Sequence, residues 1–260
     1  MFNLKIYSYI VKNKIEKLFG KKVTDDFDWK LYHTHYRGQI EGLEKKHVQI
    51  INKQDYVFQK DDLIKKNDNI LTLHPNHRLL YETILQLKPK SILELGCGGG
   101  DHLNNIHVLS PTTKLFGMEL SSEQIKFLFE RHPEIKAEIS EFDCTLPFPR
   151  NIEKVDLAYT QAVVMHIQTG NGHMVAMTNL FNAATKQVLL MENWARHDYM
   201  NEIQMLHQLK IIPWNEIYFY YRESVEYKKP HLMVVSSVQL KEYKVLTDLS
   251  ILKGKVSKND

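Results

Sequence analysis

The chain has 260 residues, of which 43% are hydrophobic and 25% charged, so one large globular domain, or one domain with an appendage, is expected. A net charge of +3 argues against a nucleic-acid-binding protein, which usually carries a stronger and clustered basic excess. Two cysteines are too few for a disulfide framework, and no apolar run approaches the roughly 20 residues that span a bilayer, so we expect a cytoplasmic protein.

Residues 2–19 predict a helix with one apolar face, because apolar side chains recur at helical spacing between lysines. Such a helix would pack on the rest of the chain or on a second copy in a homodimer. A weak contact with an anionic membrane surface is the alternative. The segment lacks the long apolar region and the cleavage site of a signal peptide.

The stretch WKLYHTHYRG, residues 29–38, is dense in aromatic and cationic side chains. Taken alone it allows a metal site, a nucleic-acid patch or the wall of an active site. Its histidines are two residues apart, so both reach one ligand only if the chain is extended. The surrounding residues 23–75 are polar and irregular in pattern, which predicts a cap or lid. With the first helix they form a predicted N-terminal helical cap over residues 1–75.

From residue 91 short apolar runs alternate with stretches of helical spacing, at 122–131 and 173–184. Alternation of this kind predicts a parallel sheet with right-handed crossovers. The link between the third and fourth runs is too short to need a full helix. Residues 216–227 and 231–238 predict a closing antiparallel hairpin. The predicted fold is therefore α/β, Rossmann-like and doubly wound, with a mostly parallel seven-stranded sheet whose last strand is antiparallel. The parallel runs lie at 91–95, 114–120, 135–140, 155–160 and 187–192.

The first predicted strand runs directly into a glycine-rich loop, in the sequence SILELGCGGGDHL. Glycines allow a sharp turn and a close approach of backbone to a ligand at a helix start. The loop therefore predicts a cofactor site at the carboxyl end of that strand. The dinucleotide fingerprint G-x-G-x-x-G/A does not fit, since Asp101 stands at its sixth position when it is read from Gly96.

The pattern that does fit is E-x-G-x-G-x-G, formed by Glu94, Gly96, Gly98 and Gly100 with Cys97 inside the loop. It resembles motif I of the class I S-adenosylmethionine-dependent methyltransferases. The resemblance implies S-adenosylmethionine as cofactor and S-adenosylhomocysteine as product, and makes residues 76–260 the methyltransferase domain. It also implies that Glu94 lies near the methionine end of the cofactor, often through water.

Further landmarks follow in the order that the family has them. The second predicted strand ends in Glu119, next to Leu120, where the resemblance implies a carboxylate that accepts hydrogen bonds from both ribose hydroxyls. The sequence SEFDCTLPF resembles the segment after strand three, which implies that Asp143 meets the adenine amino group and that Cys144 lies beside the ring. The resemblance covers residues 75–238, by pattern rather than by close identity.

The sequence VDLAYTQAVVMHI resembles strand four and its exit, which implies that Gln161 faces the methionine end and that His166 lies nearby. Methyl transfer is an in-line displacement, so positioning supplies much of the rate, and a base is needed only for a neutral hydroxyl or amine. His166, Tyr32, His33 and Arg37 are the candidate catalytic residues. In this interpretation residues 29–38 belong to a lid: Trp29, Tyr32 and Tyr36 line the wall of the site, while His33 and Arg37 face the acceptor. The alternative is a polar surface helix whose aromatic side chains pack on the core.

Two further segments, after the fourth and fifth parallel strands, are rich in polar groups. His166 could instead be a packed core histidine, His173 a solvent-exposed residue at a helix start, and Glu192 with Arg196 a structural ion pair. The number of such groups at the expected mouth of the site favours a small, polar, anionic acceptor, because cationic side chains suit an anion. These segments contribute His166, Asn171, His173, Glu192, Asn193, Trp194, Arg196 and His197.

No asparagine-proline-proline-tyrosine motif marks an amino-group methyltransferase, so oxygen is the expected methylated atom. The chain is similar to small bacterial methyltransferases of surface polysaccharide, in particular those that methylate the phosphoramidate of a Campylobacter-type capsule.

The alternatives are a methyltransferase of a nucleic acid or of another sugar or natural-product hydroxyl, and a non-catalytic binding module. A metal-dependent enzyme would need ligands beyond the pairs His33/His35 and His74/His77, and neither pair has a carboxylate or cysteine at a familiar spacing. No metal and no nucleic-acid partner is expected; the expected partner is a small-molecule or carbohydrate-linked acceptor.

Overall fold

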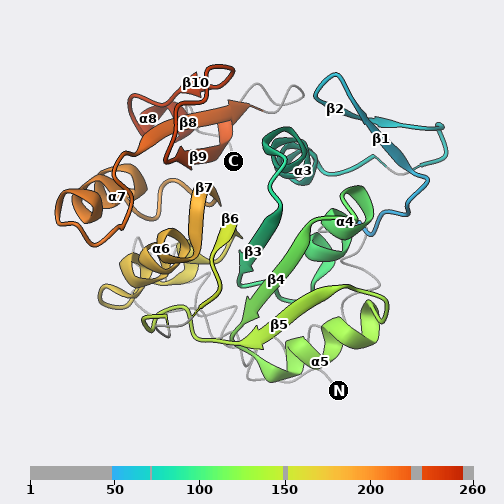
Figure 1. Ribbon diagram of the computed structural model, residues 1–260, viewed down its shortest axis with the longest axis horizontal. Helices are drawn as coiled ribbons and strands as arrows, with labels where there is room; N and C mark the ends of the chain where they lie inside the picture. The colour runs from blue at the N-terminus through green and yellow to red at the C-terminus, as the bar shows by residue number, and fades with distance from the viewer. Residues whose placement is uncertain (1–48, 71, 149–151, 224–229, 254–260) are drawn as a thin grey trace, which may run out of the picture.

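The computed structural model describes residues 49–70, 72–148, 152–223 and 230–253. Its main feature is an eight-stranded sheet with the order β10-β8-β9-β7-β6-β3-β4-β5 (Figure 1). Neighbours among the central strands pair in parallel, whereas β9 runs antiparallel to both β7 and β8. The predicted mostly parallel sheet with an antiparallel strand is confirmed, but the predicted seven strands are eight, because the two-residue β10 pairs with β8 at the edge. The strands are β3 (Ser91–Leu95), β4 (Lys114–Glu119), β5 (Ala137–Glu141), β6 (Val155–Gln161), β7 (Ala184–Met191), β8 (Tyr218–Glu223), β9 (Pro230–Ser236) and the two-residue β10 (Lys244–Val245).

Helices cover both faces of this sheet, as the doubly wound prediction requires. Side chains of one strand alternate between two cores: on β3, Leu93 and Leu95 face one core and Ile92 faces the other. The first core includes residues of α6 and α7, and the second includes residues of α3 and α4; the two pairs of helices lie on opposite sides of the sheet in Figure 1. The helices are α3 (Pro75–Leu87), α4 (Asp101–Leu109), α5 (Ser122–Arg131), α6 (Gly172–Ala183), α7 (Tyr199–Gln208) and α8 (Ser250–Lys253), with a short 3-10 helix, η1 (Val164–His166).

Local signals explain why the helices form where they do. Helix α5 begins after Ser121, whose hydroxyl accepts a hydrogen bond from Gln124 N at 3.3 Å, and it ends with Arg131 in its last turn. Its bounds equal the predicted range, and α6 differs by one residue at each end from the predicted 173–184. Between β5 and β6 the described residues, 142–148 and 152–154, contain no helix, as predicted from the short link.

The described part of the predicted cap is not irregular. It holds a β-hairpin of β1 (Tyr56–Gln59) and β2 (Asp62–Lys65), whose two-residue turn has φ values of 51° at Lys60 and 69° at Asp61. The hairpin packs on α3, where Leu63 N donates to Glu82 Oε1 at 2.9 Å. Residues 1–48, with the predicted first helix, lie outside the described residues, so the division at residue 75 stays a prediction.

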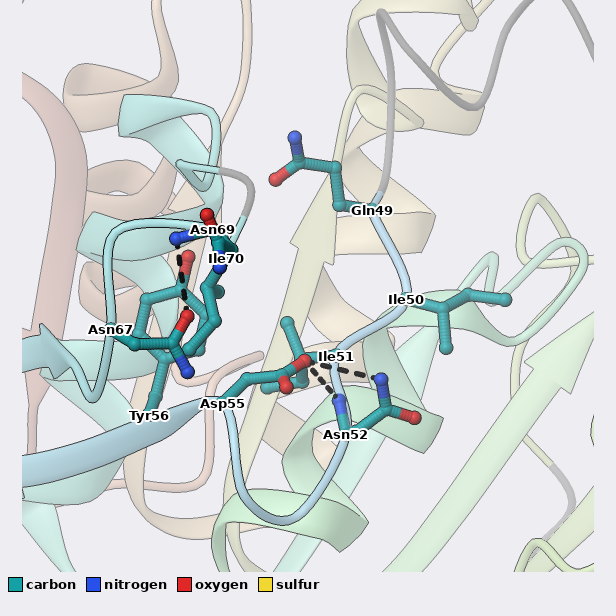
Figure 2. Close-up of a pocket in the computed structure, with 9 residues that line it drawn as sticks. All are labelled: Gln49, Ile50, Ile51, Asn52, Asp55, Tyr56, Asn67, Asn69 and Ile70. Atoms are coloured by element: carbon teal, nitrogen blue, oxygen red, sulfur yellow. Dashed lines mark hydrogen bonds between the residues drawn. The ribbon is translucent and has the colours of Figure 1, made fainter.

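A hollow of about 280 Å³ lies beside this hairpin (Figure 2). Amide and carboxylate side chains line much of it, and two of its lining residues are joined by a hydrogen bond from Asn52 N to Asp55 Oδ2 at 2.7 Å. None of the predicted site residues is among its lining residues. In the part of the chain that the structure describes, no helix is long and apolar enough to cross a membrane.

Candidate active site

The glycine loop connects β3 to α4 and is fastened to the neighbouring strand. Gly96 N and Cys97 N both donate to Met118 O, at 2.8 and 3.0 Å. Gly96, Gly98 and Gly100 have φ values of 78°, 51° and 76°, the left-handed region that favours glycine. A Cβ at Gly96 would lie 2.5 Å from Val163 Cγ2, whereas a Cβ at Gly98 would meet no atom within 4 Å. The loop is therefore packed tightly behind Gly96 and open at Gly98, where a ligand could approach the backbone.

Glu119 closes the loop from the tip of β4. Its side chain is buried, and it accepts hydrogen bonds from Gly98 N at 2.9 Å and Ser121 N at 3.0 Å. Burial raises the pKa of this carboxyl, and the backbone N–H groups of Gly98 and Ser121 oppose that rise. The predicted ribose-binding residue is thus at the carboxyl end of β4, beside the open part of the loop, with half-buried Leu120 next to it.

Glu94 lies on β3 with 2% of its surface exposed, and burial raises the pKa of its carboxyl well above the ordinary value. Its Oε2 atom has no hydrogen-bond partner among the described residues, and neither has the buried Oε1 of Gln161 at the end of β6. Two unsatisfied buried acceptors are costly unless a donor joins them. The α-ammonium of S-adenosylmethionine is such a donor, so these residues fit the methionine end of that cofactor.

The segment after β5 lies against α6. Asp143 Oδ1 accepts from Thr145 N at 2.9 Å and from Thr145 Oγ1 at 2.7 Å. Asn179 Nδ2 donates to Cys144 O at 3.0 Å, and Phe142 N donates to Glu119 O at 2.9 Å. These bonds hold the predicted adenine-binding residues beside the end of β4, and leave Asp143 Oδ2 for a ligand.

The exit of β6 is shaped by a carboxylate from the next strand. Glu192 accepts from Val163 N, Val164 N and Met165 N at 3.2, 3.3 and 3.0 Å, and from Thr160 Oγ1 at 3.3 Å. Burial raises the pKa of Glu192 to about 7. The interpretation of Glu192 as the partner of Arg196 is therefore wrong, because the carboxylate is used by the backbone of the β6 exit. His166 ends η1 in this exit and is half-buried.

A buried polar network behind the loop was not predicted. His102, in the first turn of α4, has Nδ1 2.8 Å from Tyr81 Oη, and Asn105 Nδ2 donates to the same hydroxyl at 2.9 Å. Burial lowers the pKa of His102 to about 4, so its ring is neutral, and its interaction with Gln161 opposes that shift. The network joins α3 to α4 behind the loop; the position of His102 directly after the glycine loop was the only local signal.

The structure thus gathers all ten predicted cofactor residues at the carboxyl ends of β3, β4, β5 and β6, which are adjacent strands (Figure 1). Tyr32, His33 and Arg37 lie outside the described residues, so their predicted roles remain untested. Trp194, considered for the acceptor side, is 6% exposed and packs edge-on against Tyr199 in the core.

Residues 93–184 match the family model described as a methyltransferase domain. The fold is similar to that of CalS10 bound to S-adenosylmethionine, an amino pentose methyltransferase from Micromonospora echinaspora, with a TM-score of 0.50, 12% identity, and coverage of 64% of this chain and 91% of that chain. It is also similar to a TehB-like S-adenosylmethionine-dependent methyltransferase from Corynebacterium glutamicum, with a TM-score of 0.50, 14% identity, and coverage of 84% of this chain and 100% of that chain. A search of curated protein sequences finds no significant match.

The sheet order, the glycine loop and the family match agree on one class over the matched segment. Residues 93–184 form a methyltransferase domain with S-adenosylmethionine as its cofactor, and the sheet that holds them has a Rossmann-like fold.

Replacing Glu119 by glutamine is expected to weaken S-adenosylhomocysteine binding by about 10- to 100-fold, because hydrogen bonds to a charged group contribute roughly 1.5–3 kcal/mol. Glutamine would also turn an N–H group toward the donors Gly98 N or Ser121 N. Isothermal titration calorimetry measures the effect, with Glu141→Gln, an exposed carboxyl at the end of β5, as control. Equal affinities in the two variants would show that Glu119 does not contribute to cofactor binding.

Both cysteines are expected to react slowly with iodoacetamide in the folded protein at pH 8. Burial raises the pKa of Cys97 well above its ordinary value of 9 and that of Cys144 to about 12. Since the thiolate is the nucleophile, a pKa of about 12 lowers the reactive fraction of Cys144 about a thousandfold. Mass spectrometry would follow the labelling, with urea-unfolded protein as the fast control; rapid labelling of folded Cys144 would contradict its burial.

Proposed function

We propose that this methyltransferase transfers its methyl group to an oxygen atom of a small, polar, anionic acceptor, and that the acceptor is the phosphoramidate of a bacterial capsular polysaccharide precursor. The proposal of an anionic acceptor is supported by three histidines in the segments that follow β6 and β7. His173 and His197 stack with ring centroids 4.1 Å apart, and His166 lies in the intervening exit. An imidazole carries at least one N–H group, so His166 can donate a hydrogen bond to an oxygen of an anion.

The choice of oxygen rests on the exit of β6. The backbone there reads Thr160, Gln161, Ala162 and Val163, without an asparagine-proline pair, and Ala162 has a φ of 53°. No carboxamide from such a motif is present to hold an amino group for attack. An anionic oxygen needs no base, only cationic or N–H partners that hold it in line with the methyl group.

Some of the described residues bind the cofactor, and others align the acceptor with the methyl group. Bound S-adenosylmethionine supplies the methyl group on its sulfonium. Glu94 and Gln161 bind the methionine end, while Glu119 and Asp143 fix the ribose and the adenine. Glu192 holds the β6 exit in place, and with it the backbone that carries His166. We assign His166 the role of donor to the acceptor oxygen, and Arg37, His33 and Tyr32 the role of a covering lid.

The proposal also covers the setting of the protein. We propose a cytoplasmic enzyme that acts before its product leaves the cell, as a monomer or a homodimer.

The test is release of S-adenosylhomocysteine with a panel of acceptors that includes phosphoramidates, nucleotide sugars and short oligonucleotides. Turnover with a phosphoramidate alone supports the proposal; turnover with an oligonucleotide or a neutral sugar hydroxyl alone refutes it. His166→Ala and Arg37→Ala should raise the acceptor KM or lower kcat. An unchanged rate and KM in Arg37→Ala would contradict the role of Arg37 as a cationic group that covers the acceptor.

Calorimetry with S-adenosylhomocysteine is the prior control for every variant. Protein that is folded by circular dichroism and yet does not bind S-adenosylhomocysteine would contradict the cofactor site itself. Binding of the cofactor product together with failure of all anionic acceptors would contradict only the acceptor.

A further inference from the structure

Three potential metal ligands converge on the segments that follow β6 and β7. His173 lies in the first turn of α6, His197 in the loop before α7, and Glu202 in the first turn of α7. One ligand atom from each lies within 4.8 Å of the other two. The side chains are mostly shielded, with 12% of His173 and 21% of Glu202 exposed. The positions are 24 and 5 residues apart in the chain, so no sequence spacing indicated them.

The hydrogen bonds inside this cluster leave two buried polar atoms unused. His173 Nε2 lies 3.3 Å from Glu202 Oε1, but His173 Nδ1 and Glu202 Oε2 are buried without a hydrogen-bond partner. Leaving such a group unpaired costs roughly 1–3 kcal/mol. A cation takes a lone pair from each atom, and would therefore satisfy both at once.

His197 is already held as metal-bound histidines usually are. Its Nε2 lies 3.1 Å from Val164 O and 3.4 Å from Gln168 Nε2. The carbonyl only accepts and is the shorter contact, so we assign the proton to Nε2 and the lone pair to Nδ1. A backbone carbonyl on the far ring nitrogen is the usual support that orients a histidine ligand.

One local movement is required. The rings of His173 and His197 are stacked, with 6° between their planes, whereas a metal lies in the plane of each ring that binds it. His173 is the ring that can turn, because the hydrogen bond to Glu202 is the one that its side chain makes with the described residues. His197 keeps its carbonyl support.

We propose that His173, His197 and Glu202 bind one divalent transition-metal cation, with Zn²⁺ as the best match. Two imidazoles and one carboxylate are a known zinc-ligand set, whereas Mg²⁺ and Ca²⁺ prefer oxygen ligands only. Three protein ligands leave a coordination position open. If the acceptor is anionic, that position binds one of its oxygens, a step that rests on the proposed function. The inference replaces the expectation from sequence that no metal is bound.

The test uses full-length protein without an affinity tag, treated with a chelator and dialysed. Zn²⁺ is titrated in the presence of millimolar Mg²⁺, and the bound metal is counted by plasma mass spectrometry. We expect one equivalent of tightly bound Zn²⁺, and an affinity at least about tenfold lower in His173→Ala and Glu202→Gln, since even outer-shell changes cost 10–100-fold. No tight equivalent in the wild type, or unchanged affinity in both variants, would overturn the proposal.

The histidine pair His33 and His35 supplies the matched control, because it was the metal site that the local sequence suggested. A double alanine variant at these positions should keep the tight equivalent; its loss there, with retention in Glu202→Gln, would overturn the proposal. Circular dichroism identifies any variant that fails to fold. If His173→Ala does not fold, the zinc affinity of Glu202→Gln, which keeps the shape of the side chain, decides the test. S-adenosylhomocysteine binding in the same samples is a separate readout, so failure of zinc binding with the cofactor product still bound contradicts the metal site alone.

Discussion

The alanine variant of Gly96 is expected to bind S-adenosylhomocysteine about 10- to 100-fold more weakly than the wild type, because a displaced loop loses backbone hydrogen bonds to the ligand that contribute roughly 0.5–1.5 kcal/mol each. The φ of 78° at Gly96 costs an L-residue roughly 1–2 kcal/mol. The added Cβ would lie 2.5 Å from Val163 Cγ2, on a β-branched side chain that has few alternative rotamers. Val163 N is held by Glu192, so the loop has to move instead, away from Met118 O.

Gly170→Ala separates the two causes. Gly170 has a φ of 55°, but a Cβ there would meet no atom within 4 Å. It should lose only the roughly 1–2 kcal/mol of free energy of unfolding that the left-handed conformation costs, with unchanged affinity. Urea unfolding and calorimetry measure both quantities. Gly96→Ala that binds within threefold of the wild type would show that the loop does not need its close contact with Val163.

Much of this cofactor site could be predicted because its determinants are local. Each of Glu94, Glu119 and Gln161 stands at or near the carboxyl end of an apolar run, and parallel strands bring those ends to one edge. The glycine pattern carries its own backbone requirement, which the positive φ values of Gly96 and Gly100 confirm. Helix α5 was predicted to the residue because its cap and its periodicity agree.

What could not be predicted depends on pairing across the fold. The turn of the β1–β2 hairpin uses Lys60 and Asp61 at positive φ, without the glycine or asparagine that marks such turns. Glu192 next to a conveniently spaced Arg196 suggested an ion pair, yet its donors lie 27–32 residues earlier in the chain. Only the packing of β6 beside β7 shows that these donors surround the carboxylate.

Glu192 leads to the second large expected effect, a fall in stability with rising pH that Glu192→Gln removes. Burial raises its pKa to about 7 in the folded protein, against an ordinary value of 4.5. Between these pH values the folded state binds more protons than the unfolded state, so the free energy of unfolding decreases as pH rises and stays low above pH 7. At 1.36 kcal/mol per pKa unit, the decrease approaches about 3 kcal/mol.

The difference in unfolding free energy between wild type and Glu192→Gln isolates this effect, because every other titrating group is common to both proteins. Urea unfolding at pH 5, 6, 7 and 8 should show the wild type losing about 2.5 kcal/mol relative to the variant over this range. Glu134→Gln, an exposed carboxyl before β5, should show no such trend. A difference that stays constant with pH would mean that the donors at Thr160, Val163 and Met165 outweigh burial and keep Glu192 ionised; the β6 exit would then be held by a charge rather than by a neutral acid.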